Sequence, residues 1–263
     1  MTGRTGTGPI WRRGFSPPPF IPYLVAGDPD LETTADYLKM AARMGVFAVE
    51  LGIPFSDPTA DGPVIQAASQ RALRHETALE SILGWLSGIP PENLPPLYLM
   101  TYFNLFHHMG VERFCREAQR SGRIAGVVIP DLSFEDGACY RPVFRAYGIN
   151  LVGFVSPTTS PARARKIVRE SRGFVYYVGL MGTTGSALTL TDETRRIVRD
   201  LRQWTSLPVC VGFGISSGAI AREILEFADG VIVGSRLVQD EREPDRWKKT
   251  FEEFVLSAGK GKG

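Results

Sequence analysis

Residues 47–54 read Phe-Ala-Val-Glu-Leu-Gly-Ile-Pro, and residues 55–63 continue Phe-Ser-Asp-Pro-Thr-Ala-Asp-Gly-Pro. The first stretch is apolar at nearly every position, which is typical of a strand covered on both faces of a parallel sheet. The second stretch is rich in the turn-forming residues Pro, Gly and Asp. Together they predict a buried parallel strand that ends in a long loop.

The same pattern repeats from Phe20 onward, where short apolar runs alternate with longer stretches of helical periodicity. Eight runs are predicted to be strands: Phe20–Ala26, Phe47–Ile53, Leu97–Tyr102, Gly126–Pro130, Leu151–Val155, Phe174–Gly179, Val209–Gly212 and Gly230–Val233. Eight parallel strands suit closure into a barrel, and a chain of 263 residues suits one such barrel. The sequence therefore predicts an α/β fold, a single (β/α)8 TIM barrel whose chemistry lies in the loops after the strands.

Three segments decorate this plan. The stretch Val64–Trp85 holds about two helices' worth of sequence, so we expect an extra helix after the second strand. The last helix is predicted over Asp245–Leu256, with an aromatic stripe that packs on the barrel wall. We expect residues 20–258 to form the catalytic domain, residues 1–19 a flexible arm and residues 259–263 a flexible tail. The alternative for the arm is that its basic residues contact a partner.

Composition narrows the class of protein. Hydrophobic residues make up 43% of the chain and charged residues 22%, as in globular proteins with a sizeable core. Lys and Arg number 30 against 28 Asp and Glu, so no strong basic field favours nucleic acid, and we expect a small substrate. Cys115, Cys139 and Cys210 lack metal or disulfide spacing. Without an apolar membrane span or a signal-peptide core, a cytoplasmic protein is expected.

Glu50 is the first candidate catalytic residue because it interrupts an apolar strand. An ionised carboxylate is costly to bury without a partner, and the usual result is a raised pKa. A raised pKa suits a general acid and base that works near neutral pH. The alternative is a structural carboxylate paired with a buried Arg or with backbone amides.

Asp57 and Asp61 lie in the loop after the same strand, and so would overhang the mouth of the barrel. Each has a simpler alternative role, because Asp side chains stabilise turns next to Pro and Gly. His107 and His108 are adjacent and have no neighbouring ligand set, so no metal site is predicted.

Glycine-rich segments follow the last three strands: Gly182–Gly185, Gly212–Ser217 and Gly234–Ser235. Glycine lets backbone amides approach an anion, and a helix that begins near Ser216 would direct free N–H groups toward it. Barrel enzymes often bind phosphate after strands seven and eight. These segments therefore predict a phosphate site, although a tight turn explains any single glycine.

These motifs resemble those of the tryptophan synthase alpha subunit family, and the resemblance runs from about Phe20 to the final helix. The segments that carry it occur in the family's order: Ile21–Pro29, Glu50–Gln66, Met100–Asn104, Ile129–Leu132, Gly182–Gly185 and Gly212–Ser216. The resemblance implies a lyase of tryptophan biosynthesis, which cleaves indole-3-glycerol phosphate to indole and glyceraldehyde 3-phosphate by a retro-aldol reaction.

The family's functional residues transfer to matching positions of this chain. The resemblance implies that Glu50 shuttles the protons and that Asp61 accepts the indole N–H and stabilises the cation formed when indole C3 is protonated. The implied substrate-binding residues are Tyr23, Ile65, Tyr102, Ile129, Tyr176 and Thr184. The implied phosphate ligands are Gly185, Gly214, Gly234 and Ser235.

The resemblance also implies a partner, a tryptophan synthase beta subunit that carries pyridoxal phosphate, in an α2β2 heterotetramer. Asp57 and Asp131 would face it, and this chain would hold neither cofactor nor metal. The sequence departs from the family's usual residues at Ser133, Gly179, Ser186 and Ala187, and no clear helix precedes the first strand. These changes concern coupling to the partner more than the chemistry.

Three alternatives stay open at this point. One is a stand-alone lyase that releases free indole without a partner. Another is a non-catalytic module that only activates a beta subunit, which the retained Glu50 and Asp61 disfavour. The third is a different phosphate-handling barrel enzyme, such as an isomerase, which the fold alone would not exclude.

Overall fold

The computed structural model describes residues 19–179, 190–212 and 214–259. The described strands are β1 Phe20–Val25, β2 Val49–Gly52, β3 Leu97–Met100, β4 Ile124–Val128, β5 Asn150–Leu151, β6 Gly153–Val155, β7 Val175–Val178, β8 Val209–Gly212 and β9 Gly230–Val233. The described α-helices are α1 Leu31–Arg43, α2 Pro63–Leu73, α3 Leu79–Ser87, α4 Phe103–Met109, α5 Val111–Ser121, α6 Arg141–Ala146, α7 Pro161–Glu170, α8 Asp192–Trp204, α9 Gly218–Leu225, α10 Ser235–Val238 and α11 Pro244–Gly259. None of them is long and apolar enough to cross a membrane.

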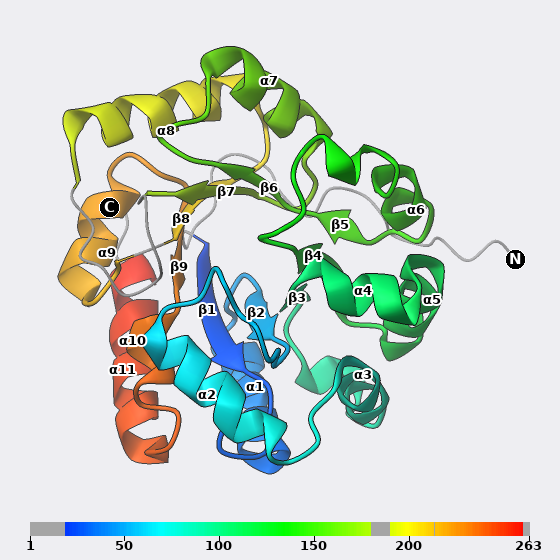
Figure 1. The fold of residues 1–263 in the computed structure, drawn as a ribbon. Helices are drawn as coiled ribbons and strands as arrows, with labels where there is room; N and C mark the ends of the chain where they lie inside the picture. The colour runs from blue at the N-terminus through cyan, green and yellow to red at the C-terminus, as the bar shows by residue number, and fades with distance from the viewer. Residues whose placement is uncertain (1–18, 180–189, 213, 260–263) are drawn as a thin grey trace, which may run out of the picture.

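The strands form one parallel sheet in the order β5-β4-β3-β2-β1-β9-β8-β7-β6. Its two ends, β5 and β6, are separated in sequence only by Val152, whose N–H donates to the Val127 carbonyl at 3.1 Å. The sheet therefore curls into a barrel, with the strands at the centre and the helices around them (Figure 1). The predicted (β/α)8 TIM barrel is confirmed, and the break at Val152 divides the predicted fifth strand into two ladders.

Two hydrophobic layers explain why consecutive apolar residues were needed. Alternate strand residues point into the barrel, where Ile21, Tyr98 and Cys210 belong to one buried cluster. Their neighbours point outward into a larger cluster beneath the helices. In α11, Phe251 and Phe254 pack on the ring of Phe20 with centroid distances of 5.6 and 6.0 Å. The stripe predicted for the last helix is thus part of the core.

The helices between β2 and β3 and the last helix lie close to their predicted positions in the sequence. Both α2 and α3 lie between β2 and β3, as predicted for that stretch. The last helix begins one residue earlier and ends three residues later than predicted. The predicted arm and tail lie outside the described residues except for Pro19 and Gly259, and the Pro19 carbonyl accepts a hydrogen bond from Val231 at 3.0 Å. Pro19 is therefore tied to the edge of the barrel.

Candidate active site

A cavity of about 910 Å³ opens among the carboxyl ends of the strands. Residues from β1, β2, β7 and β9 line it, together with the loops that follow β2, β8 and β9. The structure brings together eight of the residues singled out in the sequence: Tyr23, Glu50, Asp61, Ile65, Tyr176, Gly214, Gly234 and Ser235. Side chains separated by up to 212 positions in sequence therefore share one chamber, as expected for the active end of a barrel.

Glu50 lies in the middle of β2, in register with Tyr23 on β1 and Tyr98 on β3. Its side chain is 2% exposed, and it has no ion pair among the described residues. Burial, and secondarily the charge of Asp61, raises the pKa of Glu50 to about 8. Glu50 therefore carries its proton at neutral pH, and the described part of the chain offers no Arg partner for a purely structural role.

Asp61 lies at the end of the loop between β2 and α2, one residue before the N-cap Gly62, and is 4% exposed. Its backbone is held in place, because its N–H donates to the Pro58 carbonyl at 3.1 Å and its carbonyl accepts from Gln66 Nε2 at 2.8 Å. Burial raises the pKa of Asp61 to about 6, and a hydrogen bond from Tyr102 opposes that rise. Asp61 is therefore ionised at neutral pH.

The two oxygens of Asp61 differ. The Tyr102 hydroxyl donates to Oδ2 at 3.0 Å. The other oxygen, Oδ1, is buried and has no hydrogen-bond partner among the residues that the structure describes. A buried, unpaired carboxylate oxygen beside a cavity is costly unless a ligand supplies the missing donor.

The opposite wall of the cavity has the features of an anion site. Gly214 has φ +66°, a conformation that favours glycine. Gly234 precedes α10 and Ser235 is its first residue, so backbone N–H groups at this helix start are free of intrahelical partners. The helix after β8 was expected near Ser216 and begins at Gly218, with Ser217 as its N-cap.

Buried Asp240 holds α10 against α11. Its Oδ2 accepts from Arg236 at 2.6 Å and from the Thr250 hydroxyl at 2.7 Å. Arg236 itself lines the cavity, beside Ser235. The predicted ligands Thr184 and Gly185 lie outside the described residues, as do Ser186 and Ala187.

The position of Ile129 differs from the one predicted for it in the substrate pocket. Ile129 does not line this cavity, and faces instead a separate, smaller cavity of about 150 Å³. Its neighbours Val128 and Pro130 line the main cavity. Alternate residues of a strand point to opposite sides, and a run that is apolar at every position does not reveal which set points inward.

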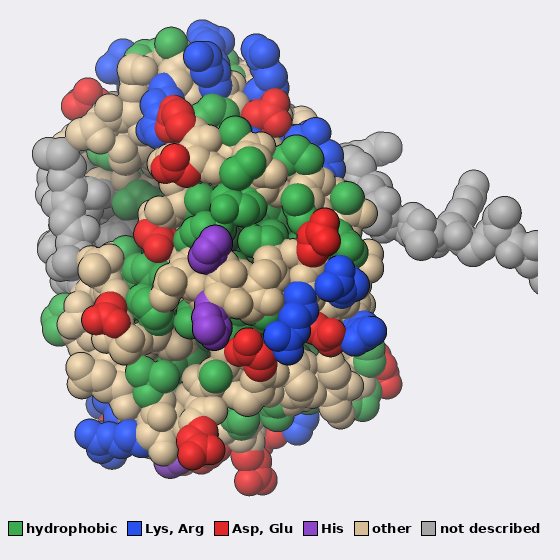
Figure 2. Space-filling view, turned by 45° about the vertical axis from the view of Figure 1, so that its right-hand side comes forward, with side chains coloured by type: hydrophobic (Ala, Val, Ile, Leu, Met, Phe, Trp, Pro, Cys, Tyr) green, Lys and Arg blue, Asp and Glu red, His purple; other side chains and the backbone are tan. Residues whose placement is uncertain are grey.

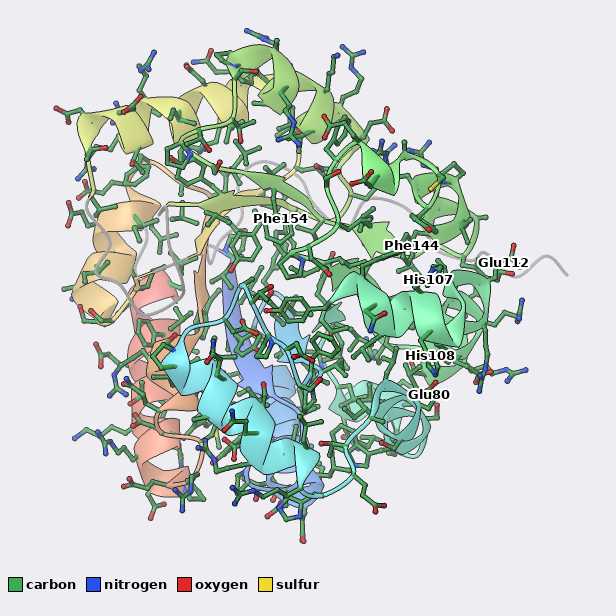
Figure 3. All side chains as sticks on the ribbon, viewed as in Figure 1. Glu80, His107, His108, Glu112, Phe144 and Phe154 are labelled. Atoms are coloured by element: carbon green, nitrogen blue, oxygen red, sulfur yellow. The ribbon has the colours of Figure 1, made fainter. Side chains whose placement is uncertain are left out.

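Phe154 is the main cavity residue that the sequence did not predict. It lines the cavity, stacks on Tyr176 with a centroid distance of 5.1 Å, and extends toward the centre of the barrel in Figure 3. Other cavity residues that were not predicted are Thr59, Ala60, Pro63, Val64, Met100, Val128, Pro130, Ser156, Val178, Ile215, Ser216, Ile232, Arg236 and Gln239. Their only sequence signal is a position at or just beyond a strand end.

Tyr102 was expected in the substrate pocket, but it is not among the residues that line the cavity. Its hydroxyl lies behind Asp61, where it also accepts a hydrogen bond from the Ala60 N–H at 2.9 Å. Asp57 is exposed and its carboxylate accepts from the Ser56 hydroxyl at 2.5 Å. Asp131 is exposed and accepts from the Phe103 N–H at 2.8 Å, at the start of α4.

His107 and His108 lie on α4, at the periphery of the barrel and away from the central strands (Figure 3). Among the described residues there is no group of three or more His, Cys, Asp or Glu side chains that could hold a metal ion. The two histidines therefore take no part in the cavity.

Comparison with known proteins agrees with this arrangement. A family model described as tryptophan synthase alpha chain matches residues 16–262. The chain is 42% identical over 238 residues to the tryptophan synthase alpha chain of Thermosynechococcus vestitus, which covers 90% of this chain and 89% of the relative. It is 45% identical over 220 residues to that of Prochlorococcus marinus, covering 83% and 80% of the two chains.

Solved structures give the same answer. The tryptophan synthase of Mycobacterium tuberculosis superposes with a TM-score of 0.83 and 31% identity, over 94% of this chain and 93% of that one. A chain of the tryptophan synthase complex of Pyrococcus furiosus superposes with a TM-score of 0.81 and 33% identity, over 94% and 100% of the two chains. From the cavity, its two carboxyl groups and these relatives together, the chain belongs to the tryptophan synthase alpha chain family.

Proposed function

We propose that this chain is the lyase of its family, and that Glu50 and Asp61 carry out the retro-aldol cleavage of indole-3-glycerol phosphate to indole and glyceraldehyde 3-phosphate. One observation supports this most directly. Two buried carboxyl groups face one cavity, and at neutral pH Glu50 is protonated while Asp61 is ionised. The reaction needs an acid and an anion together, and pairs of groups with separated pKa values provide these two roles.

In the first step the Glu50 carboxyl group gives its proton to indole C3. The ring becomes a cationic iminium, and the Asp61 carboxylate accepts a hydrogen bond from its N–H through Oδ1. Because the positive charge develops during the step, this contact is stronger in the transition state than in the bound substrate. Asp61 therefore lowers the barrier instead of only binding the substrate.

In the second step the Glu50 carboxylate removes the proton of the hydroxyl group on the carbon attached to C3. The bond between C3 and that carbon breaks, and its electron pair returns to the ring to regenerate indole. The hydroxyl carbon becomes the aldehyde of glyceraldehyde 3-phosphate. Glu50 ends with the proton that it gave away, so it acts first as acid and then as base.

The rest of the cavity suits the two ends of this substrate. Tyr23, Ile65, Phe154 and Tyr176 supply apolar surface for the indole ring. Gly214, Gly234 and Ser235 supply the amide-rich end for the phosphate, with Arg236 close by. Thr184 and Gly185 stay predictions, as ligands from the segment that the structure does not describe.

A tryptophan synthase beta subunit is the proposed partner, in an α2β2 heterotetramer, and pyridoxal phosphate belongs to that subunit rather than to this chain. The Pyrococcus furiosus relative is a tryptophan synthase complex. Figure 2 brings the side of α4 and α6 forward and shows hydrophobic side chains gathered on it. Phe103 and Phe134 are partly buried hydrophobic residues there, and Asp57 and Asp131 are exposed acids that we propose face the partner.

Two further parts of the proposal concern the chain as a whole. Residues 20–258 would act as one catalytic domain, with the segments 1–19 and 259–263 as its arm and tail. A cytoplasmic location is favoured by the free thiols of Cys115, Cys139 and Cys210, of which the first and last are buried.

The test is indole release from indole-3-glycerol phosphate by the purified chain, with and without a tryptophan synthase beta subunit. We expect slow release alone and faster release with the partner. Glu50→Gln and Asp61→Asn should each lower kcat by about 100-fold or more, the range for loss of a general acid or of a transition-state hydrogen bond.

Glu92→Gln is the matched control, because Glu92 is an exposed carboxyl group; it should leave kcat unchanged. Fast release that does not depend on the partner would favour a stand-alone lyase. Absence of cleavage under both conditions would reject the lyase, and leave a module that only activates a beta subunit or another barrel chemistry.

A further inference from the structure

Tyr102 lies behind the cavity wall and makes two hydrogen bonds to the loop after β2. Its hydroxyl accepts from the Ala60 N–H at 2.9 Å and donates to Asp61 Oδ2 at 3.0 Å. Ala60 and Asp61 lie in the loop after β2, whereas Tyr102 follows β3. One hydroxyl group therefore joins the loop that carries the proposed catalytic aspartate to the neighbouring strand.

The ring of Tyr102 is itself held from two sides. Phe55 stacks on it with a centroid distance of 5.1 Å and an interplanar angle of 28°. Tyr102 is also the N-cap of α4, and the next residue, Phe103, donates its N–H to Asp131 Oδ1 at 2.8 Å. The hydroxyl is thus presented from a fixed backbone, which a positioning group needs.

The two oxygens of Asp61 show what the contact does. The backbone of Asp61 is fixed by Pro58 and Gln66, so rotation of the carboxyl group is the freedom that remains. Tyr102 holds Oδ2 and thereby leaves Oδ1 as the buried oxygen without a partner among the described residues. Without the hydroxyl, neither oxygen would be fixed toward the cavity.

We propose that Tyr102 is the positioning residue for Asp61: its hydroxyl occupies one carboxylate oxygen and so directs the other toward the indole N–H of the substrate. This inference rests on the proposed function and assigns Tyr102 a role other than that of a pocket wall. Asp131, through Phe103, supports the same arrangement from the neighbouring loop.

The hydroxyl also favours the charged form of Asp61. The hydrogen bond from Tyr102 lowers the pKa of Asp61, against the larger upward effect of burial. Among the described residues, the other titratable groups that face Asp61 are Glu50 on β2, Tyr23 on β1 and Tyr176 on β7. All three stay protonated at neutral pH, so Tyr102 is the one whose removal is expected to shift the titration of Asp61 upward.

The test is Tyr102→Phe, which keeps the ring and removes only the hydroxyl. We expect kcat near neutral pH to fall by about 10- to 100-fold, the range for a hydrogen bond to a charged group, with a smaller change in KM. The acid limb of the kcat profile should move to higher pH. Carbon NMR of the Asp61 carboxyl group, without substrate, should show the same upward move of its titration.

Two comparisons separate positioning from a merely structural effect. Tyr147→Phe, at a half-buried position after α6 and outside the cavity, should change neither kcat nor the acid limb. In an Asp61→Asn background, Tyr102→Phe should cause little further loss, because both changes remove one interaction. An unmoved acid limb, or a full additional loss in that background, would overturn the inference while wild-type cleavage still upheld the proposed function; a wild type without cleavage would overturn both.

Discussion

Glu50 and Asp61 differ in charge at neutral pH although both are buried at the same cavity. Burial raises the pKa of Glu50 to about 8 and that of Asp61 to about 6. The active form has Asp61 ionised and Glu50 protonated, so kcat should rise as pH passes about 6 and fall as it passes about 8. Because the two groups interact, the limbs belong to the pair and not to one residue.

A single substitution tests this assignment of the limbs. The charge of Asp61 is the second cause of the raised pKa of Glu50, so Asp61→Asn should move the alkaline limb of the residual activity to lower pH. The same variant should abolish the acid limb. The measurement is kcat against pH for both proteins, and an alkaline limb that stays in place would show that Asp61 does not act on Glu50.

A site residue could be predicted from the sequence where its side chain differs in chemical type from its neighbours in the chain. Glu50 is conspicuous because a carboxylate interrupts an apolar strand, and the structure places it at the cavity. Ile129 was predicted to line the substrate pocket, but it does not line the cavity. Val127, Val128 and Ile129 are equally apolar, so no alternation in the sequence marks the residue that points inward. Phe154 had the same difficulty. The role proposed for Tyr102 depends on where the Asp61 loop lies in space, which the sequence does not provide.

Strand β2 carries Glu50 and, two residues later, Gly52. The side chain of Tyr23 on the neighbouring strand β1 requires a glycine at that position. A Cβ atom at Gly52 would lie 2.1 Å from the hydroxyl and 2.6 Å from the ring carbon Cζ of Tyr23. Tyr23 is the residue of β1 in register with Glu50. Gly52 therefore leaves the space that the Tyr23 side chain occupies.

Gly52→Ala should force Tyr23 to move, and so lower both stability and activity. The expected cost is about 1–3 kcal/mol of unfolding free energy, the usual range for overpacking a core. Adding Tyr23→Phe to the Gly52→Ala chain should recover part of the lost unfolding free energy, since it removes the hydroxyl, which is the atom closest to the added Cβ. Gly84→Ala is the matched control: Gly84 lies on an exposed face of α3, no atom lies within 4 Å of its added Cβ, and alanine there should stabilise by about 0.5–1 kcal/mol. Equal effects at Gly52 and Gly84, measured by chemical unfolding, would contradict the argument.

Elements differed in how well they could be foreseen. The strand runs and the long helices have clear periodicity, and the barrel follows from them. Helices α4 and α10, of seven and four residues, were not predicted because they are too short to show a helical repeat. Both lie directly after strands, and the start of α10 forms the proposed phosphate end of the cavity. The shortest helix, which shows the least helical periodicity, thus lies at the site itself.

At the scale of the whole molecule, a buried acidic cluster connects the segment between α10 and α11 with β1 and α1. Glu241, between α10 and α11, accepts from the Val25 N–H at 2.9 Å, and the Tyr37 hydroxyl donates to its carbonyl at 2.8 Å. Asp28 lies beside it in a two-point ion pair with Arg71, at 2.8 and 2.6 Å. Arg71 thus pairs with Asp28 and acts on Glu241 through its charge, whereas Glu241 Oε2 is buried with no hydrogen-bond partner among the described residues.

Stability should therefore decrease as pH rises, and Glu241→Gln should remove part of that decrease. Burial, and the charge of Asp28, raise the pKa of Glu241 well above its usual value, while the Val25 N–H and Arg71 oppose the rise. A carboxyl group with a raised pKa holds its proton in the folded chain but loses it in the unfolded chain, so folding free energy is lost as pH rises above the unfolded pKa. Glutamine resembles the protonated acid and keeps an acceptor for Val25. We expect its melting temperature to exceed that of the wild type by at least about 3 °C at about pH 8, and by less at about pH 5. Glu92→Gln, at an exposed site, should show no such pH dependence; a Glu241→Gln chain that is less stable at about pH 8 would mean that Glu241 is held in the folded chain as a charged partner of Arg71.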